Sequence, residues 1–275
     1  MLEETDWKIL ESSAGTKILR SEITYFRNSI LQNIPLDSIE VIKKFKNNGI
    51  CDTYGNLTEK GLIVAISYLS LEEQCKILGI KFEYAPIISK GEPEINALKF
   101  YKNQGYEGCS SEGAIIGVIL YCLCFKYIYP VEFRKYEDRF GGYLCFPKCS
   151  RATLYILINL IKNGNEKIIK KNFNKIFKRQ YYYYGKLWIS QGIDEDLVIK
   201  IYNYLGNEEF INIGRLFFSN PNLYFKGWPD LIILKNDRVR FIEVKTNDKL
   251  RRSQIITIGD FKKSTSLDIS VLRII

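Results

Sequence analysis

The sequence predicts a mixed α/β fold, with a mixed central sheet flanked by helices and a small helical domain before it. Two observations carry this prediction. Apolar residues recur at helical spacing through most of the chain, and from about Phe210 the pattern changes to that of strands. The length of 275 residues suits one large or two small domains, and 46% hydrophobic with 26% charged residues is an ordinary globular composition.

The predicted strands lie near the end of the chain. Residues 231–234 are wholly apolar, residues 239–245 alternate, and Lys235-Asn-Asp237 between them has turn chemistry, so a hairpin is expected. Asn247-Asp248 then predicts the cap of a helix from Lys249 on. Another alternating stretch, 267–271, predicts a closing strand.

Residues 1–92 are predicted to form the helical N-terminal domain. A helical pattern runs over Ile39–Gly49, a short hairpin is expected around Tyr54-Gly-Asn56, and Thr58 is placed to cap a helix that reaches Tyr68. This order resembles the wing of winged-helix domains, so a winged-helix-like fold is an open interpretation for this region.

The remainder, 93–275, is predicted to be a second domain, with a helical part over 93–205 and a core over 206–275. Pro86–Pro93 breaks any helix and is the candidate linker. A helix is expected from Glu94, and after a glycine-rich turn a strongly apolar helix is expected over Glu112–Tyr127.

The composition excludes several kinds of chemistry. The chain has no histidine, so Ser-His-Asp and Cys-His nucleophile systems and histidine general bases are ruled out.

The sequence also bears on where the protein is found. The acidic N-terminus lacks signal-peptide features, and the longest apolar run is shorter than a bilayer span of about 20 residues. The seven cysteines are an odd count, which fits reduced thiols better than a disulfide framework. We therefore expect no membrane association and a cytoplasmic protein, or a nuclear one if the source is eukaryotic.

The net charge of +9 suits a protein that meets a polyanion. The basic residues are concentrated between Lys162 and Lys186, directly before and around the tyrosines Tyr181–Tyr184. This mixture suits phosphate contact and base stacking, although a solvated helix face with a buried apolar stripe explains it equally well. The candidate DNA-binding residues here and nearer the C-terminus are Lys170, Lys171, Lys175, Lys178, Arg179, Arg251 and Arg252.

The sharpest chemical signal is Gly227-Trp-Pro-Asp230 at the start of one strand, with Glu243 and Lys245 near the end of the next. Residues i and i+2 of a strand share a face, and the hairpin can bring Asp230 beside them. Two carboxylates that meet in this way favour a hard divalent cation such as Mg²⁺ or Mn²⁺. A neighbouring lysine can orient a water nucleophile and stabilise developing negative charge.

Pro-Asp followed by Glu-x-Lys resembles the PD-(D/E)XK nuclease motif. The longer string from Gly227 through Asn247-Asp-Lys-Leu250 to Gln254 is similar to the virus-type replication-repair nuclease (VRR-NUC) branch of that superfamily. A second block, Ala97–Gly113, resembles the opening of the nuclease region of the Fanconi-associated nuclease. The resemblance covers roughly Ala97–Ile275 and implies a restriction-endonuclease-like core.

The resemblance also implies roles for individual residues. Asp230 and Glu243 would bind the metal, with the Val244 carbonyl as a backbone ligand and Glu112 as a direct or water-mediated one. Lys245 would serve the attacking water, and Gln254 would support the site or the DNA backbone. The chain departs from animal members of the family at Ser253, which stands where they carry a basic residue, and this puts dependence on a 5′ end in doubt.

The function expected from these observations is a metal-dependent, structure-selective nuclease for branched or flapped DNA, of the repair or recombination type. A type II restriction endonuclease that cuts a specific duplex sequence is the first alternative, because it shares the same core. A non-catalytic DNA-binding module is the second. A homodimer stays open, since enzymes that resolve junctions make two symmetric cuts whereas flap enzymes can act alone.

Overall fold

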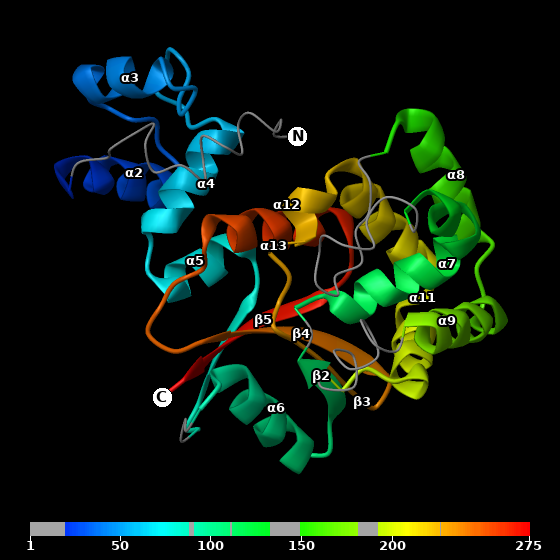
Figure 1. Cartoon of the computed structure of the whole chain (residues 1–275). Coiled ribbons are helices and arrows are strands. Elements are labelled where there is room, and N and C mark those ends of the chain that lie inside the picture. Colours follow the sequence, from blue (N-terminus) through cyan, green and yellow to red (C-terminus); the bar gives the residue numbers. More distant parts are fainter. Residues whose placement is uncertain (1–19, 88–90, 111, 133–148, 181–191, 226) are drawn as a thin grey trace. The chain divides into compact units, whose positions relative to one another are not determined.

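A computed structural model describes residues 20–87, 91–110, 112–132, 149–180, 192–225 and 227–275 (Figure 1). The chain divides into two compact units. The first unit comprises Met1–Gly79 together with Asp248–Ile256, and the second unit comprises Ile80–Asn247 with Thr257–Ile275. Among the described residues, no helix is both long enough and apolar enough to cross a bilayer.

The first unit is helical, and polar side chains start most of its helices. Ser38 and Thr58 accept hydrogen bonds from the backbone N–H groups of Val41 and Gly61. Phe26 and Phe45 pack edge to face in its core, with ring centroids 4.9 Å apart. The helices are α2 (Arg20–Gln32), α3 (Ile39–Lys46), α4 (Glu59–Tyr68) and α5 (Leu71–Leu78).

The predicted Thr58 cap and the helix that it starts are confirmed. The predicted hairpin reduces, within the described residues, to a single antiparallel bridge between Cys51 and Leu57. Asp52 holds this turn together, because its carboxylate accepts hydrogen bonds from the backbone N–H groups of Tyr54 and Asn56. This region is therefore an Asx-type turn between helices rather than a two-stranded wing.

The second unit is built on a five-stranded mixed sheet in the order β1-β5-β4-β3-β2. The pairs β1–β5 and β4–β5 are parallel, whereas β3–β4 and β2–β3 are antiparallel. The predicted mixed central sheet flanked by helices is thus confirmed. The strands are β1 (Lys81–Ala85), β2 (Glu107–Ser110), β3 (Leu231–Lys235), β4 (Arg238–Lys245) and β5 (Asp268–Ile274).

The two faces of the sheet carry different layers. One face packs against α6 (Pro93–Asn103), where Ala97 and Tyr101 contact a cluster that includes Ile233 and Val244. On the other face Trp228 lies between Phe241 of β4 and Phe261 of α13, with ring centroids 6.1 and 4.5 Å away. Figure 1 shows α6 on one side of the sheet and, on the other, the part of α13 (Arg252–Ser264) that belongs to the second unit.

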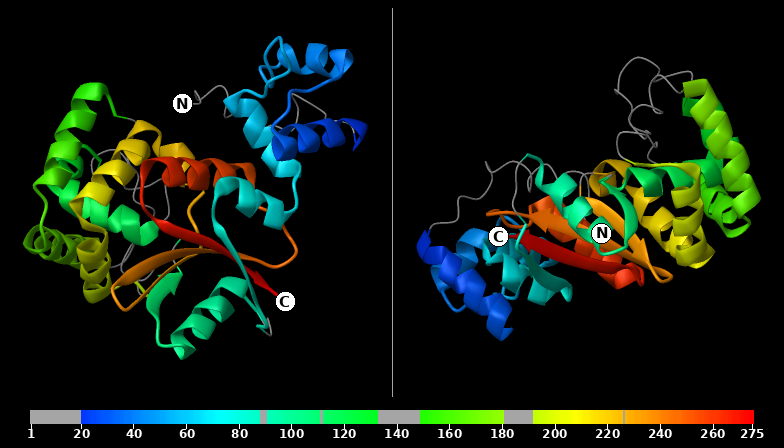
Figure 2. Two further views of the ribbon diagram at one scale, coloured as in Figure 1. Left: turned by 180° about the vertical axis from the view of Figure 1, so that it is seen from behind. Right: turned by 90° about the horizontal axis from the view of Figure 1, so that it is seen from below.

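The remaining helices form a group beside the sheet, which Figure 2 shows from behind and from below. Long α11 bends at Gly206, whose φ of 73° is outside the helical region. Side chains fix these helices to one another, for example Asn172, which donates to the backbone carbonyl of Cys122. The group consists of α7 (Ala114–Glu132), α8 (Arg151–Lys162), α9 (Glu166–Gln180), α11 (Glu195–Ser219) and α12 (Pro221–Phe225).

Three further expectations from the sequence differ from the structure. Strands were expected from about Phe210, but this residue lies in α11, where burial on most sides of the helix obscures the period of 3.6. The helix expected from Lys249 begins only at Arg252. The boundary expected at residue 92 differs from the division at Gly79, because β1 pairs with β5 and so belongs to the second unit.

Candidate active site

Asp230 stands at the junction where β3 begins. Leu231 pairs with Ile242, so the register places Asp230 beside Glu243 of the neighbouring strand. The backbone N–H of Val244 donates to Oδ2 of Asp230 over 2.7 Å. This bond holds the partly exposed carboxylate of Asp230 against β4. It satisfies the N–H of Val244, which lies beyond the last residue pair between β3 and β4.

Glu243 and Lys245 project from the same face of β4, the face opposite Val244. Glu243 is completely buried and Lys245 is 4% exposed. Nζ of Lys245 lies 2.7 Å from Oε1 of Glu243. The predicted shared face is therefore confirmed, and the two groups form a buried ion pair. Burial of both charges carries a desolvation cost that only close pairing offsets.

Burial raises the pKa of Asp230 to about 6. The hydrogen bond from Val244 and the nearby charge of Lys245 act in the opposite direction, while the carboxylates of Glu94 and Glu112 raise the pKa further. The carboxylates of Glu94 and Glu112 thus both act on Asp230, at the point where β3 begins. A cation bound here would relieve both the desolvation and the mutual repulsion.

Glu112 reaches this junction through its backbone, since its N–H lies 3.4 Å from the carbonyl oxygen of Asp230. The residue has a φ of 43°, which is unusual for a residue with a side chain, and its side chain is exposed. Gly113 follows with a φ of 79°, and a Cβ there would lie 2.3 Å from Cγ of Trp228. Close packing on Trp228 therefore positions the turn that presents Glu112 ahead of α7.

Sequence reasoning missed Glu94, the second residue of α6. Its carboxylate is close enough to raise the pKa of Asp230, so α6 contributes a charge to the same site. Its place in the first turn of a helix had an ordinary explanation, namely interaction with the helix dipole. Only the packing of α6 on the sheet shows that Glu94 belongs with Asp230.

The residues fit a hard divalent cation by the chemistry of their donors. Asp230 and Glu243 supply carboxylate oxygens, which Mg²⁺ and Mn²⁺ prefer. In the described part of the chain, no three Cys, Asp or Glu side chains are gathered tightly enough to form a ready-made metal cluster. Mg²⁺ usually keeps several water or phosphate ligands beside one or two carboxylates, and metal-ligand roles for Asp230, Glu243, Glu112 and the Val244 carbonyl all stay predictions.

Gln254, Arg251 and Arg252 belong to the first unit and are described with it. The side chain of Gln254 is buried, and its Oε1 accepts a hydrogen bond from the backbone N–H of Arg251 over 3.0 Å. This is half of a capping box at the start of α13, so Gln254 has a structural role there. Arg251 is exposed and Arg252 is partly exposed, as residues that contact DNA would have to be.

The described part of the basic segment includes α9, whose apolar stripe is buried at Ile169, Phe173 and Ile176. Lys170, Lys171 and Lys175 are exposed, so this helix has the predicted solvated face beside its buried stripe, and their role in DNA binding stays a prediction. Lys170 is engaged by Glu166 over 2.5 Å. The side chains of Lys178 and Arg179, and all of Tyr181–Tyr184, lie outside the described residues.

Comparisons with known proteins give a fold but no family. No family model matches the sequence, and no curated protein does. Solved structures do match, among them paFAN1 bound to DNA with a 2-nucleotide 5′ flap and a gap (TM-score 0.58, 14% identity) and paFAN1 bound to DNA with a 1-nucleotide 5′ flap and a gap (TM-score 0.60, 15% identity). The matches cover 92% and 86% of this chain, but only 48% and 45% of the paFAN1 chains. The chain thus spans about half of paFAN1 and shares its fold over that length.

Proposed function

We propose that this protein is a Mg²⁺- or Mn²⁺-dependent nuclease that hydrolyses phosphodiester bonds in branched or flapped DNA. The observation that carries the proposal is the convergence of Asp230, Glu243 and Lys245 where β3 begins and β4 ends. These are the residues of the Pro-Asp and Glu-x-Lys strings, so the VRR-NUC resemblance and the geometry select the same side chains.

The proposed site assigns a role to each group. Asp230 and Glu243, with the Val244 carbonyl and Glu112, would hold the divalent ion, which when bound polarises the scissile phosphate and lowers the pKa of water. Lys245 lies beside Glu243 and both side chains are buried; its ammonium group would orient the attacking water and stabilise negative charge on the phosphate. Buried charges that are held in place in this way need little reorganisation during the reaction.

The substrate class rests on two supports. The paFAN1 structures hold DNA with a 5′ flap, and the chain offers exposed basic residues on α9 and at Arg251 for phosphate contact. Because the match spans about half of paFAN1, the preference for flaps belongs to the proposal.

The test is cleavage of end-labelled linear duplex, 5′ flap, splayed arm and four-way junction DNA in Mn²⁺. Metal-dependent cutting of the branched substrates is expected, and Glu243→Ala should abolish it. Cutting of intact duplex at one fixed sequence would instead identify a restriction endonuclease. Binding that is sensitive to salt, without any cutting, would identify a DNA-binding module.

A further inference from the structure

Gln74 in α5 is completely buried, and both ends of its side-chain amide are bonded. Its Nε2 donates to the carbonyl of Ile66 over 3.0 Å and to that of Leu250 over 3.4 Å, while its Oε1 accepts from the N–H of Leu250 over 2.9 Å. An amide has both a donor and an acceptor, so it can bind both backbone groups of one residue, as a neighbouring strand would.

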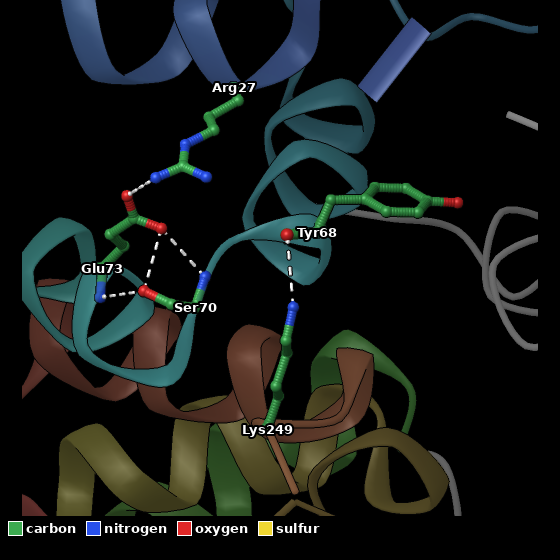
Figure 3. Close-up of polar contacts among 5 residues, drawn as sticks. All are labelled: Arg27, Tyr68, Ser70, Glu73 and Lys249. Carbon is green, nitrogen blue, oxygen red and sulfur yellow. Dashed lines mark hydrogen bonds and ion pairs between the residues drawn. The ribbon is translucent and has the colours of Figure 1, made fainter. Parts of the chain in front are cut away.

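The segment held in this way is the part of the first unit that comes from late in the sequence, Asp248–Ile256. Lys249 donates from Nζ to the carbonyl of Tyr68 at the end of α4 over 3.3 Å, as Figure 3 shows. Leu250 is 3% exposed, and Gln254 binds the N–H of Arg251. Contacts with Gln74 also explain why α13 does not begin at Lys249, since the backbone of Leu250 is engaged elsewhere.

This segment follows β4 closely along the chain. The strand ends at Lys245, and Arg251 and Arg252 come directly after the residue that Gln74 holds. An arginine whose backbone is already fixed loses less conformational entropy when it binds a phosphate. Gln74 is therefore suited to prepare these two arginines for binding without contacting DNA itself.

We propose that Gln74 is a positioning residue for DNA binding, which acts through Leu250 on Arg251 and Arg252. This inference rests on the proposed function, because it takes DNA as the substrate, and it deepens that function. It gives the N-terminal residues up to Gly79 a part in substrate binding, although none of the proposed metal-binding or water-orienting side chains lies among them.

The test measures binding of 5′ flap DNA at several salt concentrations, with Ca²⁺ in place of Mg²⁺. Gln74→Met keeps the length of the side chain but removes both hydrogen-bonding groups. We expect about tenfold weaker binding. The slope of the logarithm of the binding constant against the logarithm of the salt concentration should be shallower by about 1 to 2, since each lost phosphate contact reduces this slope by about 0.9. Replacing Arg251 and Arg252 together by Gln should have the same effect, and adding Gln74→Met to that pair should have no further effect.

Two further measurements separate positioning from a general loss of structure. Arg27→Met removes an ion pair with Glu73 in the same unit and should leave the affinity unchanged (Figure 3). Hydrogen exchange of the wild-type chain should show slow exchange at the Leu250 N–H, and this readout is available even if Gln74→Met does not fold. Lys249→Met is a milder second variant, for which a smaller loss of affinity and slope is expected.

The inference is overturned if Gln74→Met binds with wild-type affinity and slope, if its effect adds fully to that of the arginine pair, or if the Leu250 N–H exchanges rapidly. Failure of the nuclease proposal would look different, since the wild type would then bind DNA without cutting it while the Gln74 effect on binding persisted. A wild-type chain that does not bind DNA would refute the inference as well as the substrate class.

Discussion

The ammonium nitrogen of Lys245 lies 2.7 Å from a carboxylate oxygen of Glu243, and both side chains are almost completely buried. Well-packed apolar residues of similar volume often stabilise a protein as well as, or better than, a buried ion pair. The pair is therefore better explained by the chemistry proposed for the site than by stability alone, and this explanation can be tested by separating the two charges.

Lys245→Met should destabilise the protein by about 3 to 5 kcal/mol, because it leaves the buried carboxylate of Glu243 without its cationic neighbour. Combining this change with Glu243→Gln should restore most of the lost stability, since no buried charge of the pair then remains. Urea unfolding of the wild type, both single variants and the double variant measures the coupling. Additive losses would show that the two side chains do not depend on each other.

The raised pKa of Asp230 predicts a stability that depends on pH in metal-free buffer. With a pKa of about 6 in the folded chain and 3.8 as the ordinary value, the ionised carboxylate costs stability above pH 6, and the cost disappears as the pH falls below about 4. Asp230→Asn should therefore be more stable than the wild type by about 2 to 3 kcal/mol at pH 7.5, on the basis of about 1.4 kcal/mol per pKa unit.

The same variant should lose nearly all of this advantage at pH 3, where Asp230 is protonated in the folded chain and largely protonated in the unfolded chain. Urea unfolding in EDTA at the two pH values is the measurement, and addition of Mn²⁺ at pH 7.5 should stabilise only the wild type. An Asp230→Asn variant that is less stable than the wild type at both pH values would contradict the assigned burial of the charge.

Gly113→Ala should destabilise the chain by about 2 to 4 kcal/mol, because a Cβ would collide with Trp228 at a position that also has a positive φ. Gly79→Ala is the matched control, since Gly79 has a φ of 65° but open space around its Cβ position, and it should cost only about 1 kcal/mol. Gly113→Ala should also reduce cleavage by displacing Glu112. Equal losses of stability in the two variants would show that the collision with Trp228 does not contribute.

The basic face of α9 can be tested with two adjacent lysines. Lys171→Gln should weaken binding to every DNA substrate alike and reduce the salt slope by about 1. Lys170→Gln should have a smaller effect, because Glu166 already engages the Lys170 ammonium group. Filter binding at several salt concentrations distinguishes them, and a Lys171→Gln variant with an unchanged slope would show that α9 is only a solvated face.

Much of the hairpin formed by β3 and β4 could be predicted from the sequence. Turn chemistry at Asn236 and Asp237, both of which adopt positive φ, and the alternation of β4 fix the register that brings Asp230 beside Glu243. The ion pair between Glu243 and Lys245 follows from their shared face. These features are local, so a short stretch of sequence contains the information for them.

Features that depend on distant contacts could not be predicted. Strand β2 has only four residues and forms by pairing with β3, and β1 joins the sheet through β5, far away in sequence. The role of Glu94 depends on how α6 packs, and the late start of α13 depends on Gln74. In each case the local sequence pattern allowed a simpler interpretation, but contacts with residues far away in the sequence determine the structure.

The most direct test of the central claim is single-turnover cleavage of a 5′ flap duplex in Mn²⁺, comparing wild type, Asp230→Asn and Arg27→Met. We expect the wild type and Arg27→Met to cut at similar rates, EDTA to stop both, and Asp230→Asn to be slower by a factor of at least about 10³, since an isosteric amide keeps the fold but weakens metal binding. Cleavage by Asp230→Asn at the wild-type rate would contradict the assignment of the active site to the junction of β3 and β4.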